Sequence, residues 1–169
     1  MTALSHDAGS ALSHDVGETD PPLLEQTIPD NLDATVARFG DREALVDVPR
    51  GIRWTYAAFA AEVDRLARAL LAVGVAKGDR VGVWAPNCAE WVVVQYATAK
   101  IGAILVNINP SYRTHELEYV LKQAGISHLF LAESFKTSDY VAMVEEVRAS
   151  CTDLKETYVF GRDSWDALL

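Results

Sequence analysis

The alternation of short apolar runs with helical patterns constrains the fold of this chain more than any other feature. Four runs have the composition of strands: Arg80–Ala85, Ala103–Ile108, Ile126–Leu131 and Thr157–Phe160. The first three are apolar enough to be buried on both faces. A helical pattern separates each run from the next, which is typical of an open, mostly parallel sheet with helices on both faces. We therefore predict an α/β fold.

Two long helices are expected to pack against this sheet, over residues 57–73 and 88–101. In the first, Thr55 can serve as the N-cap and Gly74 can take a left-handed conformation after the last turn. In the second, apolar residues fall on nearly every face, which indicates deep packing. The apolar stripe of the first helix, spaced by three and four positions, consists of Phe59, Val63, Leu66, Leu70 and Val73.

Turn and cap signals predict the remaining elements. Asn87 is expected to cap the second long helix, and Thr114 the helix that follows the second strand. Two β-prone runs, Glu43–Val48 and Ile52–Tyr56, are separated by a Pro-Arg-Gly turn, which predicts a hairpin. The last six residues, Ser164–Leu169, are expected to begin a helix that has nothing to pack against. Shorter amphipathic helices are predicted over Asp30–Phe39 and Asp139–Ser150.

The first 22 residues differ from the rest of the chain. The segment Ala3–Ser10 (ALSHDAGS) is repeated as Ala11–Glu18 (ALSHDVGE), and the 22 residues include four acidic residues but no Lys or Arg. They hold too little apolar surface to offset the entropy that is lost on ordering. We expect a disordered acidic tail with an octapeptide duplication over residues 1–22 and a structured domain over residues 23–169.

The charge balance argues against a nucleic-acid-binding protein. The chain holds 24 Asp and Glu against 15 Lys and Arg, a formal charge of −9, and the basic residues form no cluster. The longest near-apolar stretch, Trp91–Val106, is too short and too polar to span a bilayer. Two cysteines, Cys88 and Cys151, cannot form a disulfide framework, and the N-terminus lacks a signal-peptide pattern. We expect a cytoplasmic protein without a transmembrane segment.

The common catalytic motifs are absent. The sequence has no Gly-rich phosphate loop, no nucleophile elbow and no zinc-binding helix. Gly74–Asp79 (GVAKGD) joins a helix to a strand, an order that cannot aim a helix N-terminus at a phosphate. It is interpreted as a helix C-cap and turn. His6 and His14, one in each copy of the repeat, are not assigned to a metal, because a flexible imidazole pair lacks preformed geometry.

Three further groups of reactive side chains were weighed as catalytic candidates. His115, Glu116 and Glu118 lie on the polar face of a predicted helix and are interpreted as solvated surface. His128 lies within an apolar strand, which favours a structural imidazole. Cys88 falls at a helix start, where the helix dipole favours a thiolate, but it lacks a nearby His and is interpreted as a packing residue. No catalytic, cofactor-binding or metal-binding residue is therefore assigned.

Six short motifs occur in the order and spacing of one known family. They are Thr55-Tyr56, Gly74–Val81 (GVAKGDRV), Pro86–Glu90 (PNCAE), Ala97–Ala103 (ATAKIGA), Asn109–Tyr112 (NPSY) and Glu116-Leu117. From about Leu24 onward the chain resembles the N-terminal portion of the adenylate-forming (AMP-binding) superfamily, which includes acyl-CoA synthetases, luciferases and peptide-synthetase adenylation domains. The run NINPSYR followed by HELEYVLKQAG is most similar to the fatty-acid–CoA ligase branch.

The resemblance implies an enzyme that joins a carboxylic acid to ATP as an acyl-adenylate and then transfers the acyl group to CoA. ATP, Mg and CoA are thus expected for the full-length enzyme. The family's Ser/Thr/Gly-rich phosphate loop has no counterpart in this chain. We therefore expect an N-terminal fragment that binds no cofactor, is inactive alone and uses its glycines and Asn109-Pro110 as scaffold.

Two other interpretations stay open at this point. The chain could be a non-catalytic α/β module that associates with a partner or with the missing ligase segment. An unrelated flavodoxin-like domain would need a phosphate loop after its first strand, and the sequence has none. We also expect self-association, through apolar surface that the missing segments would cover.

Overall fold

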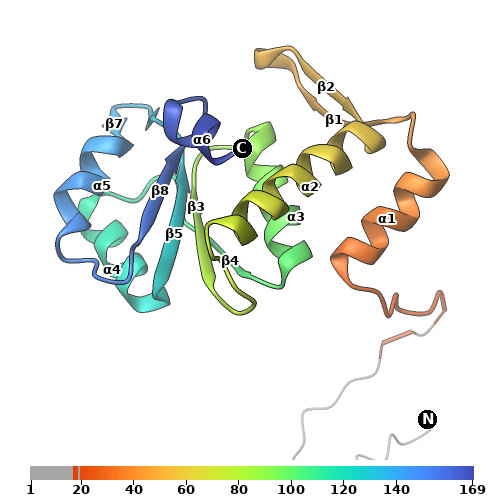
Figure 1. Cartoon of the computed structure of the whole chain (residues 1–169), viewed down its shortest axis with the longest axis horizontal. Helices are drawn as coiled ribbons and strands as arrows, with labels where there is room; N and C mark the ends of the chain where they lie inside the picture. Colours follow the sequence, from red (N-terminus) through yellow and green to blue (C-terminus); the bar gives the residue numbers. More distant parts are fainter. Residues whose placement is uncertain (1–16, 19) are drawn as a thin grey trace, which may run out of the picture.

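A four-stranded parallel sheet forms the centre of the molecule (Figure 1). The computed structural model describes residues 17–18 and 20–169. Most of the expected acidic tail, with His6 and His14, lies outside the described residues. The strand order is β4-β3-β5-β8, and every neighbouring pair is parallel. The strands are β3 (Arg80–Trp84), β4 (Ile104–Asn107), β5 (Ile126–Leu131) and β8 (Glu156–Val159).

This sheet confirms the predicted α/β fold. All of β5 and all of β3 except Arg80 are buried, as expected for strands that are covered on both faces. The register pairs Val81 of β3 with Leu105 on one side and with His128 on the other. Each strand begins and ends within one residue of the apolar run that predicted it.

Helices cover both faces of the sheet, as Figure 1 shows. One face carries α2 (Tyr56–Ala72) and α3 (Ala89–Ile101), which pack against each other, with α1 (Ile28–Phe39) outside them. The other face carries α4 (Thr114–Ala124) and α5 (Tyr140–Arg148). Each face has its own hydrophobic core, and side chains of β3 and β5 contribute to both cores.

Helix α2 follows its sequence pattern closely. The Thr55 side chain accepts a hydrogen bond from the Ala58 amide at 3.2 Å, and Gly74 takes the left-handed conformation with φ 88°. Val73 is the exception within the predicted stripe, because it lies at the C-cap and is 45% exposed. The other four stripe residues are fully buried: Phe59, Val63, Leu66 and Leu70.

An antiparallel hairpin precedes α2 and lies apart from the main sheet. Strand β1 (Glu43–Asp47) pairs with β2 (Ile52–Thr55), as predicted, and a short turn, η1 (Val48–Arg50), connects them. Gly51 ends this turn with φ 68°, a left-handed conformation that glycine adopts without strain. The sequence did not predict a small second ladder, between β6 (Ser134–Phe135) and β7 (Ser138–Asp139).

Two of the expected helix caps are wrong. Helix α3 begins at Ala89, one residue too late for Asn87 to be its N-cap, and Cys88 occupies the cap position without a side-chain bond. Thr114 is the first residue of α4 rather than its cap. The Glu116 carboxylate accepts a hydrogen bond from the Arg113 amide at 3.0 Å instead, which satisfies a free donor at the helix start.

The C-terminal helix α6 (Asp163–Leu168) is not left without packing, contrary to expectation. Trp165 is only 9% exposed, and its ring lies edge-on to Phe160 and Phe130, with centroid distances of 5.2 and 5.9 Å. Phe130 belongs to the central strand β5, so α6 joins the core on the α2 side of the sheet. The sequence pattern around Trp165 is too short to reveal this long-range contact.

Truncation of Leu66 should destabilise the fold far more than truncation of Leu71 on the same helix. Leu66 is fully buried, so Leu66→Ala should lower the free energy of unfolding by about 2–5 kcal/mol. Leu71 is 56% exposed, so Leu71→Ala should change the same quantity by less than about 0.5 kcal/mol. Urea denaturation followed by circular dichroism measures both values, and equal losses would contradict this assignment of the core.

Candidate functional site

The carboxyl ends of β3 and β5 meet at the point where ligands commonly bind in sheets of this kind. The chain leaves β3 towards α3 on one face and leaves β5 towards α5 on the other, which opens a crevice between the two connections. The loops after β3, β4 and β5 all reach this edge of the sheet. A ligand-binding site is therefore expected first at this edge of the sheet.

Two aromatic side chains, from β3 and α5, stack at this edge of the sheet. The Trp84 ring stacks on Tyr140 with a centroid distance of 3.6 Å and an interplanar angle of 9°. The indole Nε1 donates to the Asn109 carbonyl at 3.1 Å, and the Tyr140 hydroxyl donates to the Pro110 carbonyl. Burial raises the pKa of Tyr140 to about 12, so its hydroxyl stays a donor. These contacts tie three loops together.

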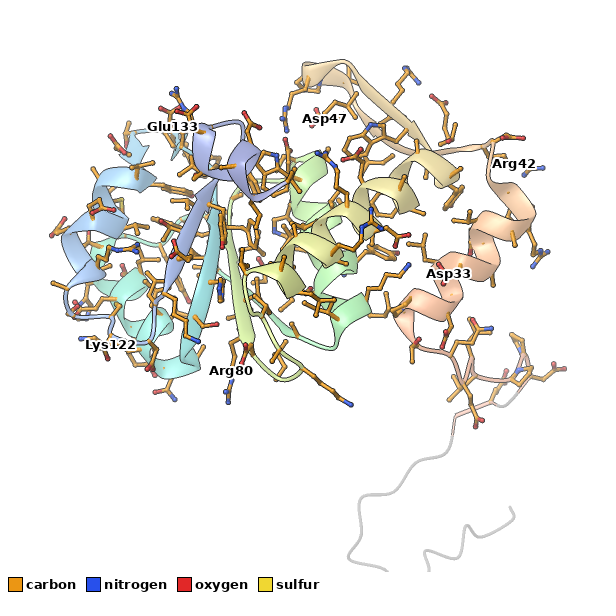
Figure 2. All side chains as sticks on the ribbon, viewed as in Figure 1. Asp33, Arg42, Asp47, Arg80, Lys122 and Glu133 are labelled. Atoms are coloured by element: carbon orange, nitrogen blue, oxygen red, sulfur yellow. The ribbon has the colours of Figure 1, made fainter. Side chains whose placement is uncertain are left out.

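A second cluster of polar groups lies nearby, where the hairpin tip meets the start of α3. Both terminal nitrogens of the Arg50 guanidinium donate to the two carboxylate oxygens of Glu90. Asp47 lies 3.9 Å from the same guanidinium, and Figure 2 labels it at the end of the hairpin. The Glu90 side chain is only 10% exposed, whereas the Arg50 side chain is 42% exposed. The pair thus joins a buried acid to a surface base.

Burial and charge oppose each other at this cluster. Burial alone would raise the pKa of Glu90, but the hydrogen bonds and charge of Arg50 outweigh it and hold that pKa below its usual value. Burial raises the pKa of the neighbouring Cys88 thiol to about 11, and the Glu90 charge acts in the same direction. Cys88 is therefore a protonated thiol at neutral pH, and the helix dipole does not activate it.

The cluster borders two cavities. One, of about 420 Å³, lies between the hairpin residues 45–49 and the first turn of α3, with Asn87, Cys88 and Val92 on the helix side. The other, of about 190 Å³, is lined by Glu90 together with side chains of β2, α2 and α6. The first is largely apolar, and its few polar groups include Asp47 on the hairpin side and Asn87 on the helix side. This is the arrangement of the described residues that most resembles a ligand site.

The other reactive candidates lie away from this cluster. His115 and Glu116 are exposed on α4, and Glu118 pairs there with Lys122, whose hydrogen bond lowers the pKa of Glu118. His128 is buried in β5, where its Nδ1 lies 3.0 Å from the Ser127 hydroxyl and burial lowers its pKa. These groups do not converge on one another.

The Gly74–Asp79 loop is a helix C-cap and turn, as interpreted from the sequence. The Asp79 carboxylate accepts a hydrogen bond from the Ala76 amide at 2.9 Å, inside the loop itself. The Gly78 amide donates to the Gly102 carbonyl at 2.9 Å, which ties the loop to the end of α3. The amides of Ala76 and Gly78 therefore already have acceptors within the fold.

Sequence reasoning missed the partnership of Arg50 and Glu90. The sequence places Glu90 only in the PNCAE motif and Arg50 only in the Pro-Arg-Gly turn. Forty positions separate the two residues, so no local pattern connects them. A Glu at the start of a helix with apolar residues on every face was the one available signal, because such an acid requires a partner when buried.

Neither a metal centre nor a membrane span is present in the part of the chain that the structure describes. Within residues 17–18 and 20–169, no three His, Cys, Asp or Glu side chains are grouped so that they could hold a metal ion. None of the helices described there combines the length and the apolar character that crossing a membrane requires.

Glu90→Gln should remove a pH-dependent contribution to the free energy of unfolding. Because the pKa of Glu90 in the folded chain lies below its usual 4.5, its charged form stabilises the fold above that pH. This contribution is lost as the pH falls through the folded pKa. The difference in unfolding free energy between wild type and Glu90→Gln, from urea denaturation, should therefore shrink between about pH 7 and about pH 3.

Glu43→Gln is the matched control for this measurement. Glu43 pairs with Arg53 on the same hairpin at 2.6 Å, but both side chains are more than half exposed. Such exposed pairs contribute little to stability, so this variant should differ from wild type only slightly at every pH. A Glu90→Gln difference that stays constant or grows on acidification would contradict the prediction.

Comparison with known proteins relates this geometry to a family. The family described as AMP-binding enzyme matches residues 32–168. A Rattus norvegicus protein named medium-chain acyl-CoA ligase ACSF2, mitochondrial, is 44% identical over 138 residues, which cover 82% of this chain and 22% of that protein. The Danio rerio protein of the same name is 44% identical over 126 residues, or 75% of this chain and 21% of that protein.

Solved structures of similar proteins share the fold. The N-terminal domain of FACL13 from Mycobacterium tuberculosis has a TM-score of 0.76 at 26% identity, covering 85% of this chain and 36% of that chain. A long-chain-fatty-acid–CoA ligase from Archaeoglobus fulgidus has a TM-score of 0.74 at 26% identity, covering 90% and 31%. The chain spans about a fifth of the length of the two vertebrate relatives above.

The family match includes every strand of the parallel sheet and all of the helices except the first turn of α1. It also includes the hairpin, the Arg50–Glu90 pair and the aromatic stack of Trp84 on Tyr140. The resemblance that six short sequence motifs indicated is therefore confirmed over most of the chain, and this protein belongs to the AMP-binding enzyme family.

Proposed function

We propose that this chain forms the N-terminal part of an ATP-dependent acid–CoA ligase that activates fatty acids. The supporting observation is its 44% identity to a medium-chain acyl-CoA ligase over 82% of its own length. Residues 23–169 would form the first portion of the AMP-binding domain. A cytoplasmic location stays a prediction from the sequence, and the vertebrate relatives carry the word mitochondrial in their names.

The reaction class follows from the chemistry of a carboxylate. A carboxylate is a poor electrophile until one of its oxygens belongs to a good leaving group. Attack of that oxygen on the α-phosphorus of ATP forms an acyl-adenylate and releases pyrophosphate. The CoA thiol then attacks the acyl carbon, loses its proton and displaces AMP. The complete enzyme would thus use ATP, Mg and CoA.

The contribution of this chain to that reaction is the scaffold. Its loops at the carboxyl edge of the sheet are tied together through Trp84 and Tyr140, and its charged cluster pairs internally. Lys100 is neutralised by the carboxylates of Asp64 and Asp33 from two other helices. We assign none of these groups to ATP, metal or CoA.

The 169-residue chain alone should not form an acyl-adenylate. Adenylation needs the reactants in line and the charge of the triphosphate neutralised by backbone amides, cations and a metal ion. The sequence has no Gly-rich loop to present such amides, and its net charge of −9 repels ATP. Acid-dependent exchange of labelled pyrophosphate into ATP, with acetate through palmitate and magnesium, should equal a no-protein blank.

Three outcomes of the exchange assay separate the alternatives. Exchange that exceeds the blank and survives repurification would overturn the proposal that the isolated chain is inactive. Exchange that appears only when a polypeptide carrying the remaining family segments is added would support a ligase assembled from parts. Binding of that polypeptide without any exchange would instead favour a non-catalytic partner-binding module.

Self-association of the isolated chain is a further proposal. Leu71, Val73 and Ile104 are 56, 45 and 50% exposed, and Ile104 lies on β4, an edge strand of the sheet. Exposed apolar side chains beside an unpaired strand edge favour contact between copies. Light scattering should show a mass above the monomer that falls on dilution, and a monodisperse monomer at every concentration would contradict the proposal.

A further inference from the structure

The tip of the β1–β2 hairpin, residues 47–51, is held differently from the base. At the base, the Tyr56 amide donates to the Arg42 carbonyl at 2.9 Å and the Ala57 amide donates to the Gly40 carbonyl at 3.0 Å. At the tip, the turn η1 has no buried residue, and Val48 is 74% exposed. The base is thus anchored by backbone hydrogen bonds, whereas the tip depends on side-chain contacts.

The side-chain contact at the tip is the two-fold hydrogen bond between Arg50 and Glu90. It joins the turn of the hairpin to the first turn of α3, elements that lie forty positions apart in the sequence. Arg50 also lies near Asp47 of its own hairpin, but that contact does not reach the helix. In the described part of the chain, the Arg50–Glu90 pair is the ion pair that links the tip to the body of the fold.

The hairpin forms one side of the cavity of about 420 Å³ described above. Its one wall consists of hairpin residues 45–49, and its other wall includes Cys88 and Val92 of the α3 region. Cys88 lies two positions before Glu90, so the thiol sits beside the contact that holds the tip in place. Cys88 is half-buried in this arrangement, and movement of the tip away from α3 would widen the cavity and expose the thiol further.

We propose that the hairpin tip is a flap, latched to the start of α3 by the Arg50–Glu90 pair, which controls access to the cavity beside Cys88. The hinge lies between the anchored base and the tip, in a two-stranded ribbon that is separate from the main sheet. Leu45 and Trp54 of this ribbon pack against the core on the α2 side, whereas the turn beyond them has no buried residue, so the tip can separate locally while both cores stay intact.

Replacement of Arg50 and replacement of Glu90 are expected to open the flap to different extents. Arg50→Gln leaves Glu90 as a buried carboxylate that gains solvent only when the tip lifts, which drives opening. Glu90→Gln leaves Arg50, which is already 42% exposed and can turn towards water. Both variants should open the flap, and Arg50→Gln should open it more.

Alkylation of Cys88 by iodoacetamide, followed by peptide mass mapping of the 169-residue chain, measures the opening. We expect Arg50→Gln to increase the alkylation rate of Cys88 by about tenfold, the population change expected for loss of a partly buried ion pair. Cys151 is 3% exposed and lies in the core on the opposite face of the sheet. Its alkylation rate therefore reports global unfolding and should rise much less than that of Cys88.

A change in thiol acidity cannot produce the expected acceleration. Burial raises the pKa of Cys88 most strongly, and the Arg50 charge lowers it. Removal of Arg50 by itself would leave the thiol less acidic and slow its reaction with iodoacetamide. A faster reaction in Arg50→Gln therefore reports greater access rather than a more reactive sulfur.

Arg53→Gln is the matched control, because it removes the same charge from the same hairpin. Arg53 pairs with Glu43 across the ribbon and does not reach α3. An unchanged alkylation rate of Cys88 in Arg50→Gln would overturn the proposal. An increase in the alkylation rate by the same factor at Cys88 and Cys151 would overturn it as well. An equal rise at Cys88 in Arg53→Gln would also overturn it, since the hairpin would then respond to charge loss in general.

Discussion

Burial of β3 on both faces and along both edges is the constraint on which the rest of this structure depends. β4 and β5 pair with its two edges, and its side chains enter both hydrophobic cores. Gly82 at its centre leaves room for side chains of β5, because a Cβ there would lie only 3.0 Å from the side chain of Leu129 and 3.1 Å from that of Ile126. A strand so enclosed requires helices on both faces, and α3, α4 and α5 supply them as the connections between strands.

Local patterns in the sequence were sufficient to predict these elements. The strand β5 matches its apolar run residue for residue, and α2 has the predicted cap at Thr55 and the predicted left-handed Gly74. Both predictions depend on neighbouring residues, whose spacing determines which side chains share a face. The hairpin could be predicted in the same way, because its turn signal lies between its two strands.

Contacts between distant residues could not be predicted in the same way. The stack of Trp84 on Tyr140, the packing of Trp165 on Phe130 and the pair of Arg50 with Glu90 each join residues from separate elements. Their geometry arises only after the sheet has assembled. The same limit applies to the candidate site. Its cavity and charged rim come from the hairpin and α3, which the sequence predicts individually but does not place side by side.

The aromatic stack has a mechanical consequence for the carboxyl edge of the sheet. A single indole is stacked on the first residue of α5 and bonded to the loop after β4, so three connections at the carboxyl edge behave as one stiff platform. A platform of this kind transmits a displacement without absorbing it. A displacement of any one of these loops would therefore move this edge as a whole and concentrate the deformation in segments that have no such contacts.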